Sequence, residues 1–356
     1  MSRSRPHEKP AEPRQTALGG GRCAVVIPSV AQRKMIRSAG VLSVAMAIGL
    51  VACGGQPPPS EETRPPAEAL APALTPAPSH GTTGPALKVP RRIVSLVPAV
   101  TEMLFAIGAG PRMVGVSSFD TYPPEVAALP RVGALLDPDL ERIISLKPDL
   151  VVISETHTEL RAQLSRAGIA TFAYALGDLG NVARTIRALG AATGFEWQAS
   201  LVSKTIESRL DAVREQVAGQ PKVRTLLVFG RQPESLREIY VSGGVGFLHD
   251  LVELAGGANV FGGVKREAVQ ATTETILSSA PDAIVELRYG RSFTPEQLAR
   301  ERLSWNRLSA VPAVRRGRIY ILVGDELVVP GPRVADTAER IARVLHPATT
   351  CATGGR

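Results

Sequence analysis

Two glutamates, Glu141 and Glu274, occupy the same place in a repeated sequence motif. Both copies read Glu-x-Ile-aliphatic-Ser-x-x-Pro-Asp-x-aliphatic-Val. The pattern predicts a helix, a break at the proline and a buried strand in each copy. Each glutamate would then stand in the first turn of its helix, where a negative charge is favourable. Two similar α/β units that each carry one carboxylate indicate binding of a partner at two points more than catalysis.

Alternating strands and helices must position these residues. The aliphatic runs predict strands over 92–97, 113–116, 150–153, 169–174, 225–229, 283–287 and 319–323. The intervening patterns predict helices over 100–107, 159–167, 195–218, 246–255, 295–302 and 334–345. The helix that carries Glu141 is expected to begin with Asp137 as its N-cap and Pro138 in its first turn.

This alternation predicts an α/β fold of two lobes. Each lobe should hold a central, mostly parallel sheet flanked by helices. Residues 195–218 contain no glycine or proline and carry aliphatic residues at helical spacing. At 1.5 Å per residue, a helix of that length spans roughly 35 Å. We expect it to join the lobes as one long backbone helix.

The N-terminal region resembles that of a bacterial lipoprotein. A basic stretch at 33–37 precedes an apolar run at 39–52, which is too short for a stable membrane anchor. The run ends in Leu50-Val-Ala-Cys53-Gly, which resembles a lipobox, so Cys53 is the expected acylation site. The alternative is a secreted protein cleaved nearby. The expected location is extracytoplasmic, on a membrane through the lipid anchor, and periplasmic if the cell has an outer membrane.

The chain divides into seven expected segments with different compositions. They are a disordered extension or mis-assigned start (1–34), a lipoprotein signal peptide (35–52), an acylated cysteine with a Pro/Ala-rich tether (53–90), an N-terminal lobe (91–178), connecting helices (179–220), a C-terminal lobe (221–347) and a tail (348–356).

Charge and motif content argue against two classes of function. The formal net charge is +8, but much of the excess lies before residue 38, and no basic run is interleaved with aromatics as nucleic-acid binding would need. There is no Gly-x-Ser-x-Gly, His-Glu-x-x-His or Walker motif, and the glycine-rich 242–246 segment is typical of a turn. We therefore expect neither nucleic-acid binding nor catalysis, with an enzyme on this scaffold as a remote alternative.

Several segments together resemble the class III substrate-binding proteins of ABC importers, which deliver vitamin B12, haem or ferric siderophores. The resemblance rests on Ile93–Glu102, Val114–Ser118, Tyr122–Pro124 and Leu140–Val151, and it continues through Gly256–Phe261 to about residue 345. It implies a small-molecule chelate as cargo, and an ABC permease dimer with its ATPase as partners. It also implies that Glu141 and Glu274 dock onto arginine pockets of the permease. The simpler interpretation is that both only stabilise their helix starts.

Ligand is expected between the lobes, at the carboxyl ends of the strands. Aromatic side chains there could stack on a macrocycle, and arginines could hold carboxylates in pairs of hydrogen bonds. Packing within a lobe is the alternative for the aromatics, and a solvated strand end is the alternative for the arginines. The candidates are Phe119, Tyr122, Arg231, Tyr240, Arg288 and Tyr289, with Glu155, Thr156 and His157 left open.

The resemblance does not settle the cargo. Phe119 and Tyr240 match aromatic positions of the B12 receptor's cleft, but two of its tryptophans correspond to Ala134 or Leu135 and to Ala268. Haem receptors place an iron-ligating tyrosine in the same Ala134 region. The expected cargo is therefore a cobalt or iron chelate, cobalamin or a ferric siderophore-like compound, with haem as the alternative.

A receptor for bare zinc or manganese is a further alternative, since such receptors share the long-helix architecture. Bare zinc needs three or four converging ligands. Between residues 91 and 347 the chain has only His157, His249 and His346, and only His157 follows a strand. Neither a protein-bound metal nor a cofactor is expected. The three cysteines, Cys23, Cys53 and Cys351, leave no intramolecular disulfide once the leader is removed and Cys53 is acylated.

Overall fold

A computed structural model describes residues 89–290 and 292–347. The proposed signal peptide, Cys53, all but the last two residues of the tether and the C-terminal tail lie outside these ranges. Between residues 89 and 347, no helix combines the length and the apolar character that crossing a bilayer requires.

The first sheet contains four parallel strands in the order β2-β1-β3-β4. These strands are β1 (Ile93–Ser95), β2 (Met113–Val116), β3 (Leu150–Ser154) and β4 (Ala170–Tyr174). The helices of this lobe are α1 (Pro98–Ala106), α2 (Leu140–Ser145) and α3 (Thr158–Arg166), with 3-10 turns η1 (Gly110–Arg112) and η2 (Pro124–Ala128). All of β1 and most of β3 are buried, as continuous aliphatic runs predict for a sheet covered on both faces.

The second sheet has the order β10-β9-β5-β6-β8, with β7 paired to β5. Its strands are β5 (Val223–Gly230), β6 (Ile239–Ser242), β7 (Gly257–Asn259), β8 (Ala268–Ala271), β9 (Ala283–Arg288) and β10 (Ile319–Val323). Its helices are α6 (Phe247–Leu254), α7 (Thr273–Ser279), α8 (Pro295–Leu303), α9 (Pro312–Arg315) and α10 (Val334–Leu345), with η3 (Ser304–Leu308) and η4 (Asp325–Val328). The mostly parallel sheet is confirmed, but β6 and β8 add antiparallel pairs that the sequence did not predict.

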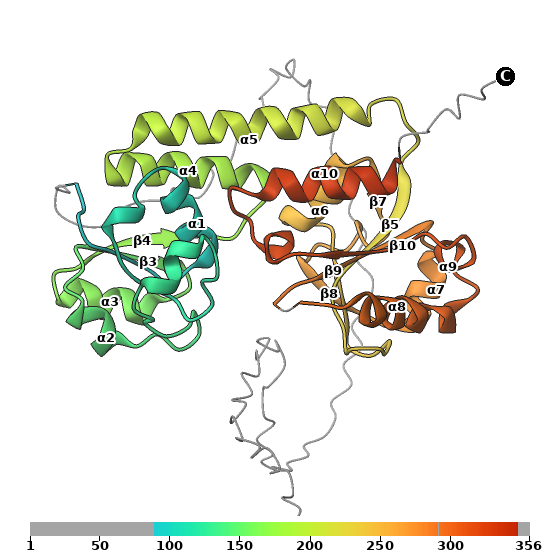
Figure 1. Ribbon diagram of the computed structural model, residues 1–356, viewed down its shortest axis with the longest axis horizontal. Helices are drawn as coiled ribbons and strands as arrows, with labels where there is room; N and C mark the ends of the chain where they lie inside the picture. The colour runs from blue at the N-terminus through green and yellow to red at the C-terminus, as the bar shows by residue number, and fades with distance from the viewer. Residues whose placement is uncertain (1–88, 291, 348–356) are drawn as a thin grey trace, which may run out of the picture. The chain divides into compact units, whose positions relative to one another are not determined.

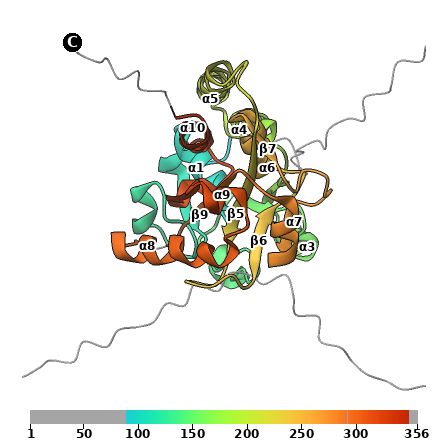
Figure 2. The same cartoon turned by 90° about the vertical axis from the view of Figure 1, so that its right-hand side faces the viewer.

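Two helices connect the sheets in sequence, α4 (Leu179–Thr193) and α5 (Glu196–Gln216). The turn between them needs Gly194, whose φ is +73°, and the helices approach closely at Gly190, where an added Cβ would lie 2.4 Å from that of Ala199. Helix α5 also packs along α10, and Arg209 ties the two through Asp336 at 2.6 Å. Figure 1 shows α5 along the top, above α4 and α10, and Figure 2 shows the same order from the side.

One apolar cluster extends through both lobes and the connecting helices. It includes Leu104 of α1, Ile186 of α4, Ile206 of α5, Leu251 of α6 and Ile341 of α10. The separate clusters beneath each sheet are smaller. Because the lobes share this core, their relative position is set by packing and not by a short hinge.

The start of α2 differs from the sequence prediction. The N-cap is Asp139, not Asp137, and its carboxylate accepts a hydrogen bond from the Arg142 N–H at 2.8 Å. Asp137 instead exchanges two backbone hydrogen bonds with Ala134, which forms a tight turn before the helix. Proline at 138 therefore follows this turn and does not open the helix.

Candidate functional site

The loop after β2 presents two of the predicted aromatic side chains to solvent. Phe119 is 48% exposed and Tyr122 is 42% exposed. Between them Asp120 is buried, and its carboxylate accepts a hydrogen bond from the Ser117 N–H at 2.8 Å. Burial raises the pKa of Asp120 above its usual range. Arg131 donates to the carbonyls of Ser117 and Asp120, at 3.0 and 2.7 Å, so the loop that carries the aromatics is fixed from beneath.

An ion pair joins the two lobes beside Tyr122. Arg333, just before α10, donates to both carboxylate oxygens of Glu102 on α1, at 2.6 and 2.9 Å. The same guanidinium lies 3.9 Å above the centre of the Tyr122 ring. Glu102 is buried, and burial raises the pKa of its carboxyl group although Arg333 acts in the opposite direction. The Glu102–Arg333 pair therefore holds the two lobes together at this point. It also fixes the position of Tyr122, one of the predicted ligand residues.

Glu326 of η4 gives Arg333 a second carboxylate, at 3.5 Å, and also pairs with Arg340 at 2.5 Å. Arg333 thus carries little uncompensated positive charge. Glu102 lies within the family-like segment of the sequence, but no pattern in the sequence indicated that Arg333 would be its partner.

Arg231 and Arg288 lie at the strand ends, as the sequence predicted, but their side chains are buried. Both lie in an internal cluster with Glu286 of β9 and Glu301 of α8, with N–O distances of 2.5 to 3.0 Å. The Arg231 side chain is 0% exposed and that of Arg288 is 10% exposed. The cluster is completed by Trp305, whose indole N–H donates to Glu286 at 2.9 Å. In this structure the arginines therefore balance buried carboxylates and do not meet the open surface.

The two remaining aromatic candidates are half-buried. Tyr240 lies on β6 and packs against Gly230, near the end of β5. Tyr289 follows β9, and burial raises its pKa. The next residue, Gly290, donates its N–H to Asp325 at 2.7 Å, which holds the end of β9 against η4. Neither residue is fully buried.

The three residues left open after β3 lie around the start of α3. Glu155 and Thr156 are exposed, and His157 is the N-cap residue, with a buried Nδ1 that has no hydrogen-bond partner among the described residues. Within 89–290 and 292–347, no group of three or more His, Cys, Asp or Glu side chains is arranged to hold a metal ion.

Glu141 and Glu274 occupy equivalent positions. Each is exposed and is the second residue of its helix, after the N-caps Asp139 and Thr272. Thr272 accepts a hydrogen bond from the Thr275 N–H at 3.2 Å and forms a capping box with it. The sequence prediction that both glutamates stand at helix starts is confirmed.

The aspartates of the two repeat copies have structural roles. The Asp149 carboxylate accepts from the backbone N–H groups of Arg91 and Arg92, at 2.8 and 2.9 Å, and so fixes the chain before β1. Asp282 pairs with Arg316 at 2.6 Å, before β9. Of the two acidic positions in each motif, only the glutamate is left for an outside partner.

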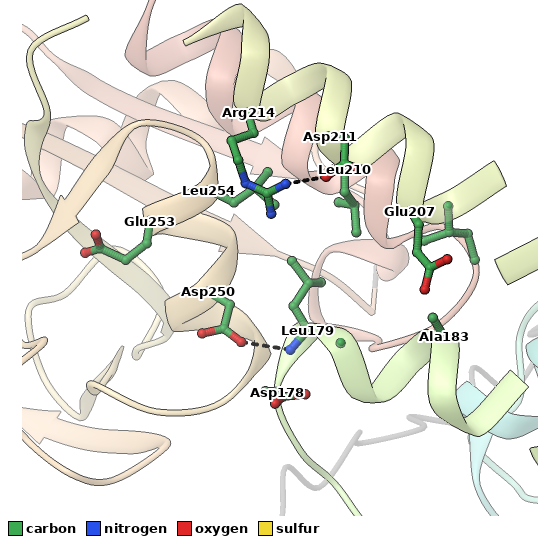
Figure 3. Close-up of a pocket in the computed structure, with 12 residues that line it drawn as sticks. Asp178, Leu179, Ala183, Glu207, Leu210, Asp211, Arg214, Asp250, Glu253 and Leu254 are labelled. Atoms are coloured by element: carbon green, nitrogen blue, oxygen red, sulfur yellow. Dashed lines mark hydrogen bonds and ion pairs between the residues drawn. The ribbon is translucent and has the colours of Figure 1, made fainter. Parts of the chain in front are cut away.

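A hollow of about 750 Å³ lies elsewhere, between α4, α5 and α6 (Figure 3). Its lining includes Leu179, Leu210, Asp211, Arg214 and Asp250. The carboxylates there are already engaged, since Asp250 accepts from the Leu179 N–H at 2.8 Å and Asp211 pairs with Arg214. This hollow is lined by α4, α5, α6 and Asp178 just before α4, and by none of the candidate ligand residues, so it is not the predicted ligand site.

Comparisons with known proteins agree with this architecture. Residues 93–325 match the family model described as periplasmic binding protein. An ABC transporter substrate-binding lipoprotein of Bacillus subtilis is 32% identical over 268 residues, which cover 74% of this chain and 82% of the relative. A vitamin B12-binding protein of Salmonella choleraesuis is 30% identical over 257 residues, covering 71% and 90%.

A solved structure extends the likeness to the fold. The haem-binding protein RhuT of Roseiflexus superposes with a TM-score of 0.60 at 26% identity, covering 72% of this chain and 97% of RhuT. The Salmonella relative is named for vitamin B12 and the Roseiflexus protein for haem. The chain belongs to the periplasmic binding protein family, in its class III branch.

Proposed function

We propose that this chain is the substrate-binding lipoprotein of an ABC importer and is not an enzyme. It captures a metal chelate between its lobes and delivers it to a permease dimer through Glu141 and Glu274. The observation that carries the proposal is the equivalence of the two glutamates. They lie at the same position of two capped helices, one on each lobe, within copies of one motif. Exposed carboxylates of this kind steer encounter and fix register with a basic partner.

The matched test compares glutamates at equivalent helix positions. Glu159 of α3 and Glu296 of α8 are also exposed second residues of their helices, one on each lobe, but lie outside the repeat. The Glu141→Ala/Glu274→Ala variant is expected to lower uptake roughly ten-fold, with the loss growing as salt is reduced, because charge pairs set encounter and register. Glu159→Ala/Glu296→Ala should leave uptake unchanged.

Ligand affinity measured on the same variants separates docking from capture. Both double variants should bind cargo as the parent does, because none of the four substituted glutamates is among the candidate ligand residues. Equal uptake by the two double variants would refute the docking role. Loss of cargo binding in the Glu141→Ala/Glu274→Ala variant would show that these residues act in capture.

The proposed cargo is cobalamin or a ferric siderophore-like chelate. Support comes from the exposed Phe119 and Tyr122 on a fixed loop, since aromatic faces suit large conjugated or ring-rich ligands. Haem is the second candidate, favoured by the likeness to a haem-binding protein. Titration with cyanocobalamin, haemin and a ferric catecholate, each repeated on Phe119→Ala and Tyr122→Ala, decides between them. Saturation by none of the three probes would reject the chelate class.

The proposed lipid anchor is tested at Cys53. Several buried acyl chains hold a protein on a membrane, because each CH₂ contributes about 0.8 kcal/mol. Cys53→Ala should therefore move the protein from the membrane fraction to the soluble fraction, and a labelled fatty acid should be incorporated only into the parent. Continued lipid labelling of Cys53→Ala would place the anchor at another residue.

A further inference from the structure

The first turns of α5 present apolar side chains outward. Trp197 is 73% exposed and Leu201 is 52% exposed, although large apolar residues elsewhere on this helix, such as Ile206 and Leu210, are buried. Lys204 is exposed as well. The spacing of four and three residues places Trp197, Leu201 and Lys204 on one face. This face is opposite the one that α5 packs against α4 and α10, and tryptophan is seldom left so accessible on a helix.

The tether enters the folded part of the chain beside this face. Val89, the first described residue, packs on Gly194, where an added Cβ would lie 3.2 Å from the valine Cγ1. Arg112 donates from one nitrogen to the Pro90 and Thr193 carbonyls, at 3.1 and 2.7 Å. Its guanidinium also lies 4.5 Å from the centre of the Phe195 ring. The chain that leads back to Cys53 is therefore fixed at the α4–α5 corner, within one turn of Trp197.

We propose that Val89, Trp197, Leu201 and Lys204, together the α5 patch, bind the surface of the bilayer that holds the lipid anchor. The inference rests on the proposed anchor at Cys53. Tryptophan suits the interface because its ring is apolar and its N–H remains hydrated. Leu201 and Val89 (51% exposed) add apolar area, and Lys204 suits anionic head groups. Asp211 and Glu215 lie further along α5 and confine the contact to its N-terminal half.

The α5 patch is separate from the proposed docking glutamates. In Figure 1 α5 forms the upper edge, whereas α2 and α7, which carry Glu141 and Glu274, lie well below it. Contact with lipid through α5 would leave both glutamates uncovered.

Tryptophan fluorescence can test this contact directly. The chain has two tryptophans, and Trp305 is 0% exposed inside the second lobe. The lipidated protein is reconstituted into vesicles that contain anionic lipid and chains brominated near the head group. We expect quenching of most of the Trp197 emission and a blue shift relative to detergent solution. In Trp197→Phe only Trp305 remains, and its emission should not be quenched.

Substitution of the second apolar residue provides the matched control. Leu201→Ser should reduce quenching of Trp197, whereas Leu303→Ser should not, because Leu303 is equally accessible (60% exposed) but lies on α8. Vesicles without anionic lipid should show weaker quenching if Lys204 contributes as proposed.

Three outcomes would overturn the proposal, and flotation of the vesicles separates them. Protein that floats with the vesicles but shows no quenching would retain the anchor and refute the α5 patch. Protein that does not float would refute both the anchor and the α5 patch. The proposed ligand-binding and docking roles would be unaffected by that result. A dimer in solution that Trp197→Ser dissociates, with no quenching by lipid, would assign the face to a second copy of the chain.

Discussion

Arg231→Ala is expected to lower the free energy of unfolding by about 3–5 kcal/mol, a large effect for a single substitution. The reason is the burial of its partners. Glu286 and Glu301 are 1% and 2% exposed, and Arg231 lies 3.0 and 2.8 Å from them. Removal of the guanidinium leaves two buried carboxylates to share Arg288. Urea denaturation followed by the fluorescence of buried Trp305 would measure the loss.

The control for this prediction is Arg300→Ala, on the same helix as Glu301. Arg300 pairs with Glu234 at 2.8 Å, but both side chains are about half exposed. Exposed pairs contribute little to stability, so the urea midpoint should hardly change. Adding Glu286→Gln to Arg231→Ala should recover part of the stability, because one uncompensated charge is removed. A loss no larger than that of Arg300→Ala would show that the cluster is not stabilising through its charges.

Arg333→Ala is expected to lower the free energy of unfolding by about 3 kcal/mol at neutral pH, since it leaves Glu102 buried without its bidentate partner. The loss should depend on pH. The pKa of Glu102 is already raised from 4.5 by burial, and without Arg333 it should rise further. A carboxyl group whose pKa is raised by folding binds its proton more tightly in the folded state. Its contribution to stability is therefore greatest below 4.5 and declines as pH rises through the folded pKa.

Thermal unfolding at several pH values would check this prediction. The stability that Arg333→Ala loses relative to the parent should grow as pH rises above 4.5. In the Glu102→Gln/Arg333→Ala variant the deficit should be smaller and nearly independent of pH, because the buried side chain no longer titrates. A deficit that is constant with pH in Arg333→Ala, or one unaffected by Glu102→Gln, would show that packing and not charge accounts for the loss.

Local patterns predicted the regular elements well. The strand at 319–323 and the helix at 334–345 have the predicted bounds, and the second residue of each repeat helix is the predicted glutamate. These predictions depend on periodicity and on glycine or proline at the ends, which are properties of neighbouring residues. The Asp139 cap was missed because Asp137 and Asp139 are equally good caps in sequence, and only the turn made by Ala134 selects the second.

Long-range pairing explains what the sequence could not provide. Nothing near Glu102 identifies Arg333 as its partner, since the two are 231 positions apart. The role of Arg231 was missed for a related reason, but here a signal existed. Glu286 interrupts the apolar run of a strand predicted to be buried, and a buried carboxylate requires a cation. That requirement favours an inward orientation for Arg231, which follows β5, and for Arg288, the last residue of the neighbouring strand β9.

Under the proposed function, the core shared by the lobes determines how cargo can leave. The apolar cluster and the Glu102–Arg333 pair already join the lobes in the folded protein, so little ordering between the lobes remains. Such preorganisation reduces the conformational entropy lost on capture and favours slow release. Separation of the lobes would break this packing, so it is costly. The permease would then supply the free energy needed for release through its contacts with Glu141 and Glu274, which lie on different lobes. Release of cargo would therefore be coupled to the transport cycle of the permease.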